Sequence, residues 1–249
     1  MKILIVANWK CNPTTLKEAK VLFNGIKKKV KSGKTEVVVC PPFVYLSSVA
    51  FGEGGFTLGA QDCFWEEKGA FTGEVSALQL RDLKIKYVII GHSERRKYFN
   101  ETDEQINKKI KRALSAKLKV ILCIGETQDE QKSGKKLEVL EKQIRQGLQG
   151  VSAKEIKNIV IAYEPVWAIG AGNNCSLDQA ESSFLFIRKA TSNLYNRKIA
   201  SDLKILYGGS VTSANAVSYI ESARANGLLV GGASLKAEEF IKIVKDSAR

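Results

Sequence analysis

Three side chains suited to acid–base chemistry stand just beyond apolar segments of the sequence. Glu164 follows IVIAY, His92 follows YVIIG, and Lys10 lies shortly after ILIVA. A carboxylate with an apolar wall behind it is a stronger base, because desolvation disfavours its charged form. An imidazole can polarise a carbonyl or carry a proton between oxygens, and an ammonium group can stabilise charge developing on oxygen. Together the three residues predict proton transfer beside a carbonyl.

Each residue also has a simpler explanation when taken alone. Glu164 fits a solvated strand end, His92 a buried core histidine, and Lys10 a surface lysine. Lys10 fits a Schiff-base lysine as well, and its spacing does not separate that chemistry from electrostatic catalysis.

The sequence predicts no metal centre and no cofactor. His92 is the only histidine, and the five cysteines are widely spaced without a C-x-x-C pair, so the common nitrogen and sulfur ligand sets are missing. No G-x-G-x-x-G motif follows the first apolar run, which argues against a dinucleotide site. We expect reduced and mostly buried thiols, with Cys123 in VILCIG as part of the core.

Two glycine pairs predict a phosphate site. Gly208 with Gly209 and Gly231 with Gly232 follow the last two apolar runs, and serines lie just beyond them. Without Cβ atoms, backbone N–H groups can approach a phosphate closely, and the amino terminus of a following helix adds a favourable dipole. The alternative is that the glycines serve tight turns with positive φ.

Segment 165–174, PVWAIGAGNN, has the composition of a lid. Proline and tryptophan stiffen one side of it, and glycines make its tip flexible. A lid over a base, an electrophile and a phosphate cradle predicts a small phosphorylated substrate. Closure would exclude water and hinder loss of phosphate from a reactive enediolate.

Eight short apolar runs, separated by amphipathic stretches, predict the strands that position these residues. We place them at 2–7, 35–40, 56–60, 87–90, 119–124, 158–163, 204–207 and 228–230. Continuous apolarity indicates burial on both faces, as in a parallel sheet covered by helices. This pattern favours a single-domain α/β fold over residues 1–249, a (β/α)8 TIM barrel, over a doubly wound open sheet.

Helix-start signals and charge complete the prediction. Helices are expected after Asp103, after Ser152, and at the capping box of Ser176 with Gln179.

The net charge is +13, but lysine-rich segments such as NKKIKRA carry apolar residues at helical spacing, which favours solvated helix faces over a nucleic-acid partner. A basic surface would also steer an anionic substrate. With no long apolar run and no cleavage signal, we expect a mature, cytoplasmic protein without a membrane partner.

Seven segments occur in the order found in triosephosphate isomerases: ANWKCN, GAFTGE, IIGHSERR, CIGET, AYEPVWAIG, YGGSV and LVGGASL. The resemblance covers essentially the whole chain. It implies that Glu164 is the base and His92 a neutral electrophile, and that Lys10 and Asn8 bind substrate and its oxyanion. Glu94 resembles the acidic residue close to that lysine and histidine.

The same resemblance implies a phosphate-binding set and a dimer. Gly170, Ser210, Gly231 and Gly232 correspond to the phosphate set, and Thr72 to a loop tip that enters the partner subunit of a homodimer. The implied reaction interconverts dihydroxyacetone phosphate and D-glyceraldehyde 3-phosphate in glycolysis and gluconeogenesis, without a cofactor.

The chain departs from the family pattern at Ala7, Cys11 and Asp62, and in the lid at residues 171 and 173–175. None of these positions removes a group assigned to catalysis. Three alternative functions fit the same barrel: another phosphosugar isomerase, an aldolase, and a phosphate-sensing protein without turnover.

Overall fold

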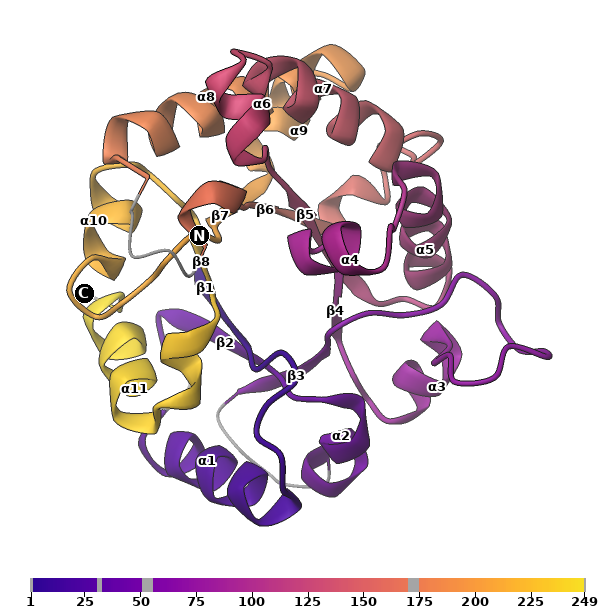
Figure 1. Cartoon of the computed structure of the whole chain (residues 1–249), viewed down its shortest axis with the longest axis vertical. Helices are drawn as coiled ribbons and strands as arrows, with labels where there is room; N and C mark the ends of the chain where they lie inside the picture. The colour runs from indigo at the N-terminus through magenta and orange to yellow at the C-terminus, as the bar shows by residue number, and fades with distance from the viewer. Residues whose placement is uncertain (1, 31–32, 51–55, 170–174, 249) are drawn as a thin grey trace.

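Eight parallel strands close into a barrel in chain order (Figure 1). The computed structural model describes residues 2–30, 33–50, 56–169 and 175–248. The strands are β1 (Ile3–Asn8), β2 (Thr35–Cys40), β3 (Thr57–Ala60), β4 (Tyr87–Ile90), β5 (Lys119–Ile124), β6 (Ile159–Tyr163), β7 (Lys204–Tyr207) and β8 (Gly227–Val230). β8 pairs with β1 to complete the ring. The predicted (β/α)8 barrel is confirmed, and each predicted strand end lies within one residue of the observed one.

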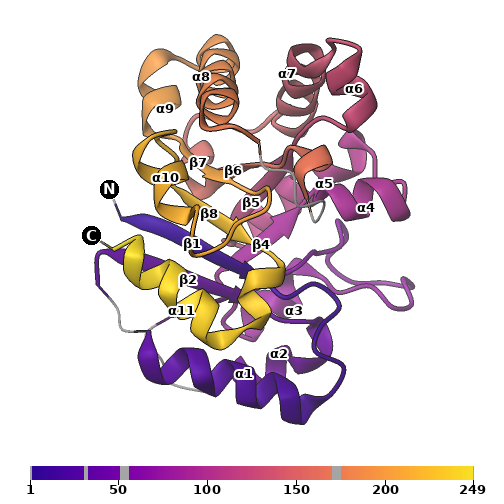
Figure 2. The same cartoon turned by 60° about the vertical axis from the view of Figure 1, so that its left-hand side comes forward.

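Helices surround the strands as an outer layer (Figure 1). The α-helices are α1 (Leu16–Lys29), α2 (Phe43–Ala50), α3 (Ala77–Asp82), α4 (Ser93–Tyr98), α5 (Asp103–Ser115), α6 (Gln128–Lys132), α7 (Lys136–Gly147), α8 (Leu177–Leu194), α9 (Arg197–Asp202), α10 (Ala216–Glu221) and α11 (Ala237–Asp246). The 3-10 turns among the described residues are η1 (Ile156–Asn158), η2 (Val166–Ala168) and η3 (Gly232–Leu235). Figure 2 shows β1 pointing toward the side of the molecule where α4 lies.

The apolar runs are buried on both faces, as predicted. One core cluster joins the helices to the outer faces of the strands, and a second fills the barrel with residues such as Leu4, Ile89 and Leu206. Cys123 belongs to the second cluster, and only Cys11 among the five free cysteines is exposed. In the described part of the chain, no helix is long and apolar enough to cross a bilayer.

The structure has α-helices at two of the three predicted starts. Ser176 and Gln179 form the predicted capping box of α8, whereas α5 is capped by Thr102 and begins with Asp103. No α-helix begins directly after Ser152, so this prediction is wrong. Its hydroxyl donates to Glu155 at 2.6 Å and closes a turn before η1. Because β6 begins soon afterwards, only tight turns fit there.

One lysine of NKKIKRA is not on a solvated face, so that prediction is wrong at Lys109. Lys109 is 2% exposed, and its ammonium group donates to both carboxylate oxygens of Asp62, at 2.9 and 2.7 Å, and to Glu101. The Nε atom of Arg95 lies 2.9 Å from Asp62. Buried charges require partners of this kind, and these partners come from other elements of the fold.

Candidate active site

A cavity of about 500 Å³ opens where the strands end, and seven of the predicted site residues line it. The parallel arrangement explains this convergence, because the carboxyl ends of all eight strands meet on one face of a barrel. The seven residues are Asn8, Lys10, His92, Glu164, Ser210, Gly231 and Gly232.

Glu164 and His92 contact each other at the bottom of this cavity. Glu164 follows the fully buried strand β6 and is only 2% exposed. Its Oε1 lies 3.1 Å from Nε2 of His92, and its Oε2 accepts the backbone N–H of Ser93 at 2.9 Å. The simpler explanation of a solvated strand end therefore does not fit Glu164.

The hydrogen bonds of His92 indicate where its proton is. Nδ1 accepts the backbone N–H of Glu94 at 3.2 Å, in the first turn of α4. An accepting ring nitrogen carries no proton, so the imidazole proton is on Nε2. That N–H points at Glu164 and is the group available to a substrate oxygen.

Lys10 is held toward the cavity by a strained backbone and an ion pair. Its φ is 54°, a left-handed value that is uncommon for a residue with a side chain. Its N–H donates to Oδ1 of Asn8 at 3.0 Å, and its carbonyl accepts from Gln61 at 2.8 Å. Nζ lies 2.5 Å from Oε1 of Glu94. Glu94 does not line the cavity, and it acts on the site through its ion pair with Lys10.

The glycine pairs do not serve as positive-φ turns, so the alternative explanation for them fails. None of the four has a positive φ. The first pair has close neighbours: a Cβ on Gly209 would lie 2.3 Å from the Tyr207 hydroxyl, and one on Gly208 3.0 Å from Cγ of Glu164. In the second pair, a Cβ on Gly231 would only touch Lys10 at 3.4 Å, and one on Gly232 would meet nothing within 4 Å. Close packing therefore explains Gly208 and Gly209, whereas Gly231 and Gly232 leave open space beside the cavity that they line.

The two glycine pairs differ in the elements that come after them. η3 begins at Gly232 and directs backbone N–H groups toward its start, whereas α10 begins only at Ala216, well after the first pair. Ser210 lines the cavity. Ser234 is buried and its hydroxyl donates to the Gly231 carbonyl at 2.7 Å, so it supports the loop.

A buried thiol lies beneath the base. Burial raises the pKa of Cys123 well above its ordinary value, and the nearby Glu164 carboxylate raises it further. Cys123 is therefore a neutral part of the barrel interior. In the portion of the chain that the structure describes, no group of three His, Cys, Asp or Glu side chains could hold a metal ion.

Glu126 anchors the start of the lid, a role that the sequence alone did not predict. It is fully buried, and its Oε1 accepts from Nε1 of Trp167 at 2.9 Å and from the Tyr163 hydroxyl at 3.0 Å. The backbone N–H of Val166 donates to its carbonyl at 3.0 Å. The signal was its place shortly after β5, in CIGET. Gly170, the predicted lid glycine, lies outside the described residues.

Cys175, directly after the lid segment, is held by a hydrogen bond from α10. The Tyr219 hydroxyl donates to the Cys175 carbonyl at 2.5 Å, and the Tyr219 ring stacks on Tyr207 at 3.6 Å. Tyr207 precedes the first glycine pair, so this contact connects the lid to the predicted phosphate site.

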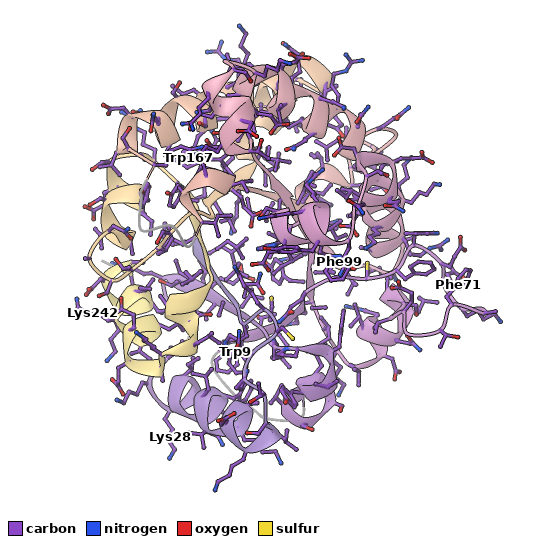
Figure 3. The ribbon with its side chains drawn as sticks, in the orientation of Figure 1. Trp9, Lys28, Phe71, Phe99, Trp167 and Lys242 are labelled. Atoms are coloured by element: carbon purple, nitrogen blue, oxygen red, sulfur yellow. The ribbon has the colours of Figure 1, made fainter. Side chains whose placement is uncertain are left out.

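Thr72 is not part of the cavity. It is exposed on the loop between β3 and α3, next to Phe71, which Figure 3 shows at a protruding edge of the molecule.

Comparison with known proteins agrees with this geometry. A family model described as triosephosphate isomerase matches residues 3–247. A triosephosphate isomerase of Alkaliphilus oremlandii is 47% identical over 245 residues, covering 98% of both chains. That of Caldanaerobacter subterraneus subsp. tengcongensis is 48% identical over 243 residues, covering 97% of this chain and 98% of the relative. The chain belongs to the triosephosphate isomerase family.

Proposed function

We propose that this chain interconverts dihydroxyacetone phosphate and D-glyceraldehyde 3-phosphate, a step of glycolysis and gluconeogenesis, by moving one proton between adjacent carbons. The observation that carries the proposal is the 3.1 Å approach of the Glu164 carboxylate to Nε2 of His92 in a cavity that Lys10 also lines. Family membership supports the same reaction.

The proposed reaction begins when Glu164 leaves His92 and Ser93 to remove a carbon-bound proton. The electron pair of that C–H bond forms the carbon–carbon double bond of an enediolate, and negative charge moves to the former carbonyl oxygen. Nε2–H of His92 donates to that oxygen and carries a proton between the two oxygens. Glu164 then returns its proton to the neighbouring carbon, so no net oxidation occurs and the steps use side chains only.

Lys10 and Asn8 bind substrate and stabilise the oxyanion in this scheme. The Lys10 ammonium supplies positive charge where the negative charge develops, and Glu94 positions it through the 2.5 Å ion pair.

The phosphate binds to Ser210 and to the backbone around Gly231 and Gly232, with Gly170 contributing from the lid. The lining of the cavity supports the first three assignments, and family resemblance alone supports Gly170.

The proposed functional unit is a cytoplasmic homodimer, each subunit a single domain over residues 1–249. Thr72 enters the partner subunit near its active site. The exposed position of the loop supports this role.

A coupled isomerase assay on purified protein tests the function and separates an enzyme from a phosphate-sensing protein. Glu164→Asp should lower kcat by about 100-fold or more, because the shorter side chain withdraws the carboxylate from the proton, while circular dichroism shows an intact fold. Undiminished turnover would refute the role of Glu164. Borohydride trapping of Lys10 with substrate would instead indicate an aldolase.

A further inference from the structure

A second cavity of about 360 Å³ lies at the other end of the barrel from the active site. The first residues of four neighbouring strands line it: Tyr87, Lys119, Ile159 and Lys204. η1 and α9 complete its walls. The packed barrel interior lies between the two cavities, so the proposed isomerase reaction does not use this one.

Four lysines surround this amino-end cavity. Lys119, Lys157, Lys198 and Lys204 line it against a single carboxylate, Asp202. Among the residues described, Lys157 and Lys198 have no acidic group within 4 Å. Lysines clustered in a concave site raise the local concentration of anions.

Lys119 and Lys204 share the surroundings of one carboxylate, that of Glu36. The Tyr87 hydroxyl donates to Oε1 of Glu36 at 2.7 Å, and Nζ of Lys119 donates to the same hydroxyl at 3.2 Å. Nζ of Lys204 lies 3.9 Å from Oε2 of Glu36. Glu36 thus contacts the Lys204 ammonium group directly, whereas the Lys119 ammonium group contacts the Tyr87 hydroxyl. Burial lowers the pKa of Lys204. The Glu36 carboxylate raises this pKa, and the positive charge of Lys119 lowers it.

The remaining wall is apolar. Ile156, Ile159, Val160, Ile199 and Leu203 line it. A site of this size, with apolar walls and a few convergent charges, is typical for a small organic ligand. An inorganic anion would leave the apolar wall unused.

We propose that this cavity binds a phosphate monoester carried on an aromatic or branched apolar body. The phosphate would lie among the lysine ammonium groups, where its two negative charges offset the excess of positive charge, and the body would cover the isoleucines. A carboxylate on the same body should bind more weakly, because it carries one charge.

Titration of the full-length chain with phenyl phosphate, followed by backbone amide NMR, tests the site. We expect saturable shifts at Ile199, Leu203 and Lys204, in addition to any shifts at Gly209 and Gly232 of the active site. Inorganic phosphate and benzoate should each bind at least about fivefold more weakly. Shifts confined to the active site up to about 10 mM ligand, or equal affinity for inorganic phosphate, would overturn the proposal.

Substitution of the two unpaired lysines provides the matched comparison. Lys157→Gln with Lys198→Gln should weaken phenyl phosphate binding at this site about tenfold and leave isomerase turnover unchanged. Lys142→Gln with Lys154→Gln removes the same charge from exposed positions outside the cavity and should preserve the affinity. Equal weakening by both pairs would show that general surface charge, and no built site, attracts the ligand.

Discussion

The backbone carbonyl oxygen of Glu164 lies 1.7 Å from the position that a Cβ on Gly125 would occupy. Residue 125 follows β5 and residue 164 follows the neighbouring strand β6, and the Glu164 N–H donates to the Ile124 carbonyl at 2.7 Å. A side chain at 125 would therefore displace the backbone that carries the base.

Gly125→Ala should lower kcat by about 10- to 100-fold, since a displacement near 1 Å can have that effect on a positioned base. Overpacking should also reduce the free energy of unfolding by about 1–3 kcal/mol. Gly33→Ala is the control, because a Cβ at Gly33 meets nothing within 4 Å. Activity assays and urea unfolding measure both effects, and normal kcat in Gly125→Ala would contradict the positional argument.

Trp167→Phe should impair the lid more than the fold. The change keeps an aromatic ring but removes the 2.9 Å hydrogen bond to Glu126, which should cost about 1–3 kcal/mol in stability because Glu126 is fully buried. Tyr163→Phe removes the other hydrogen bond to the same oxygen, at 3.0 Å, from within the barrel. We expect comparable losses of stability from both variants but a several-fold change in KM and kcat from Trp167→Phe alone. Equal kinetics would show that Glu126 does not act through the lid.

The contribution of Asp62 to the stability of the protein should fall as pH rises from about 4 to 6. Burial raises the pKa of Asp62 to about 6. The positive charge of Lys109 lowers it, the carboxylate of Glu101 raises it, and the positive charge of Arg95 lowers it. In this pH window the folded chain keeps a proton that the unfolded chain has released, so unfolding becomes easier as pH rises. The contribution is on the order of 2–3 kcal/mol and is lost above the folded pKa.

Asp62→Asn removes this titration. The unfolding free energy of the variant, relative to the natural chain, should therefore increase by about 2 kcal/mol between pH 4 and pH 7. Urea unfolding at fixed protein concentration measures it, with Asp82→Asn at an exposed position as the control. A pH-independent difference would remove Asp62 as the source.

Phe71→Asp should shift the proposed dimer toward monomers. Phe71 is 43% exposed beside Thr72, and Leu78 and Phe99 are further exposed apolar side chains on α3 and just after α4. A charge at the centre of such an interface should raise the dissociation constant about 100-fold. Sedimentation at several concentrations measures the mass. Leu185→Asp, on α8 and 62% exposed, should leave it unchanged, as α8 lies across the ring from the loop (Figure 1).

The barrel and the convergence of the candidate site residues could be predicted from the amino-acid sequence. Its apolar runs are long enough to show burial on both faces, and a parallel barrel brings the residues beyond each strand to one end. For this reason Glu164, His92 and Lys10 were predictable as neighbours before any distance was known. The capping box of α8 was predictable too, because it depends only on Ser176 and Gln179.

Contacts between residues that are distant in sequence could not be predicted, because they depend on how the elements pack. The burial of Lys109 depends on carboxylates from other elements, and the anchoring of the lid depends on Glu126, after β5, meeting Trp167, after β6. Side-chain periodicity reports which face of an element is apolar, but it does not report which charged or polar group from another element lies opposite. That pairing is set by packing, and it also created the lysine-lined cavity at the amino end of the barrel.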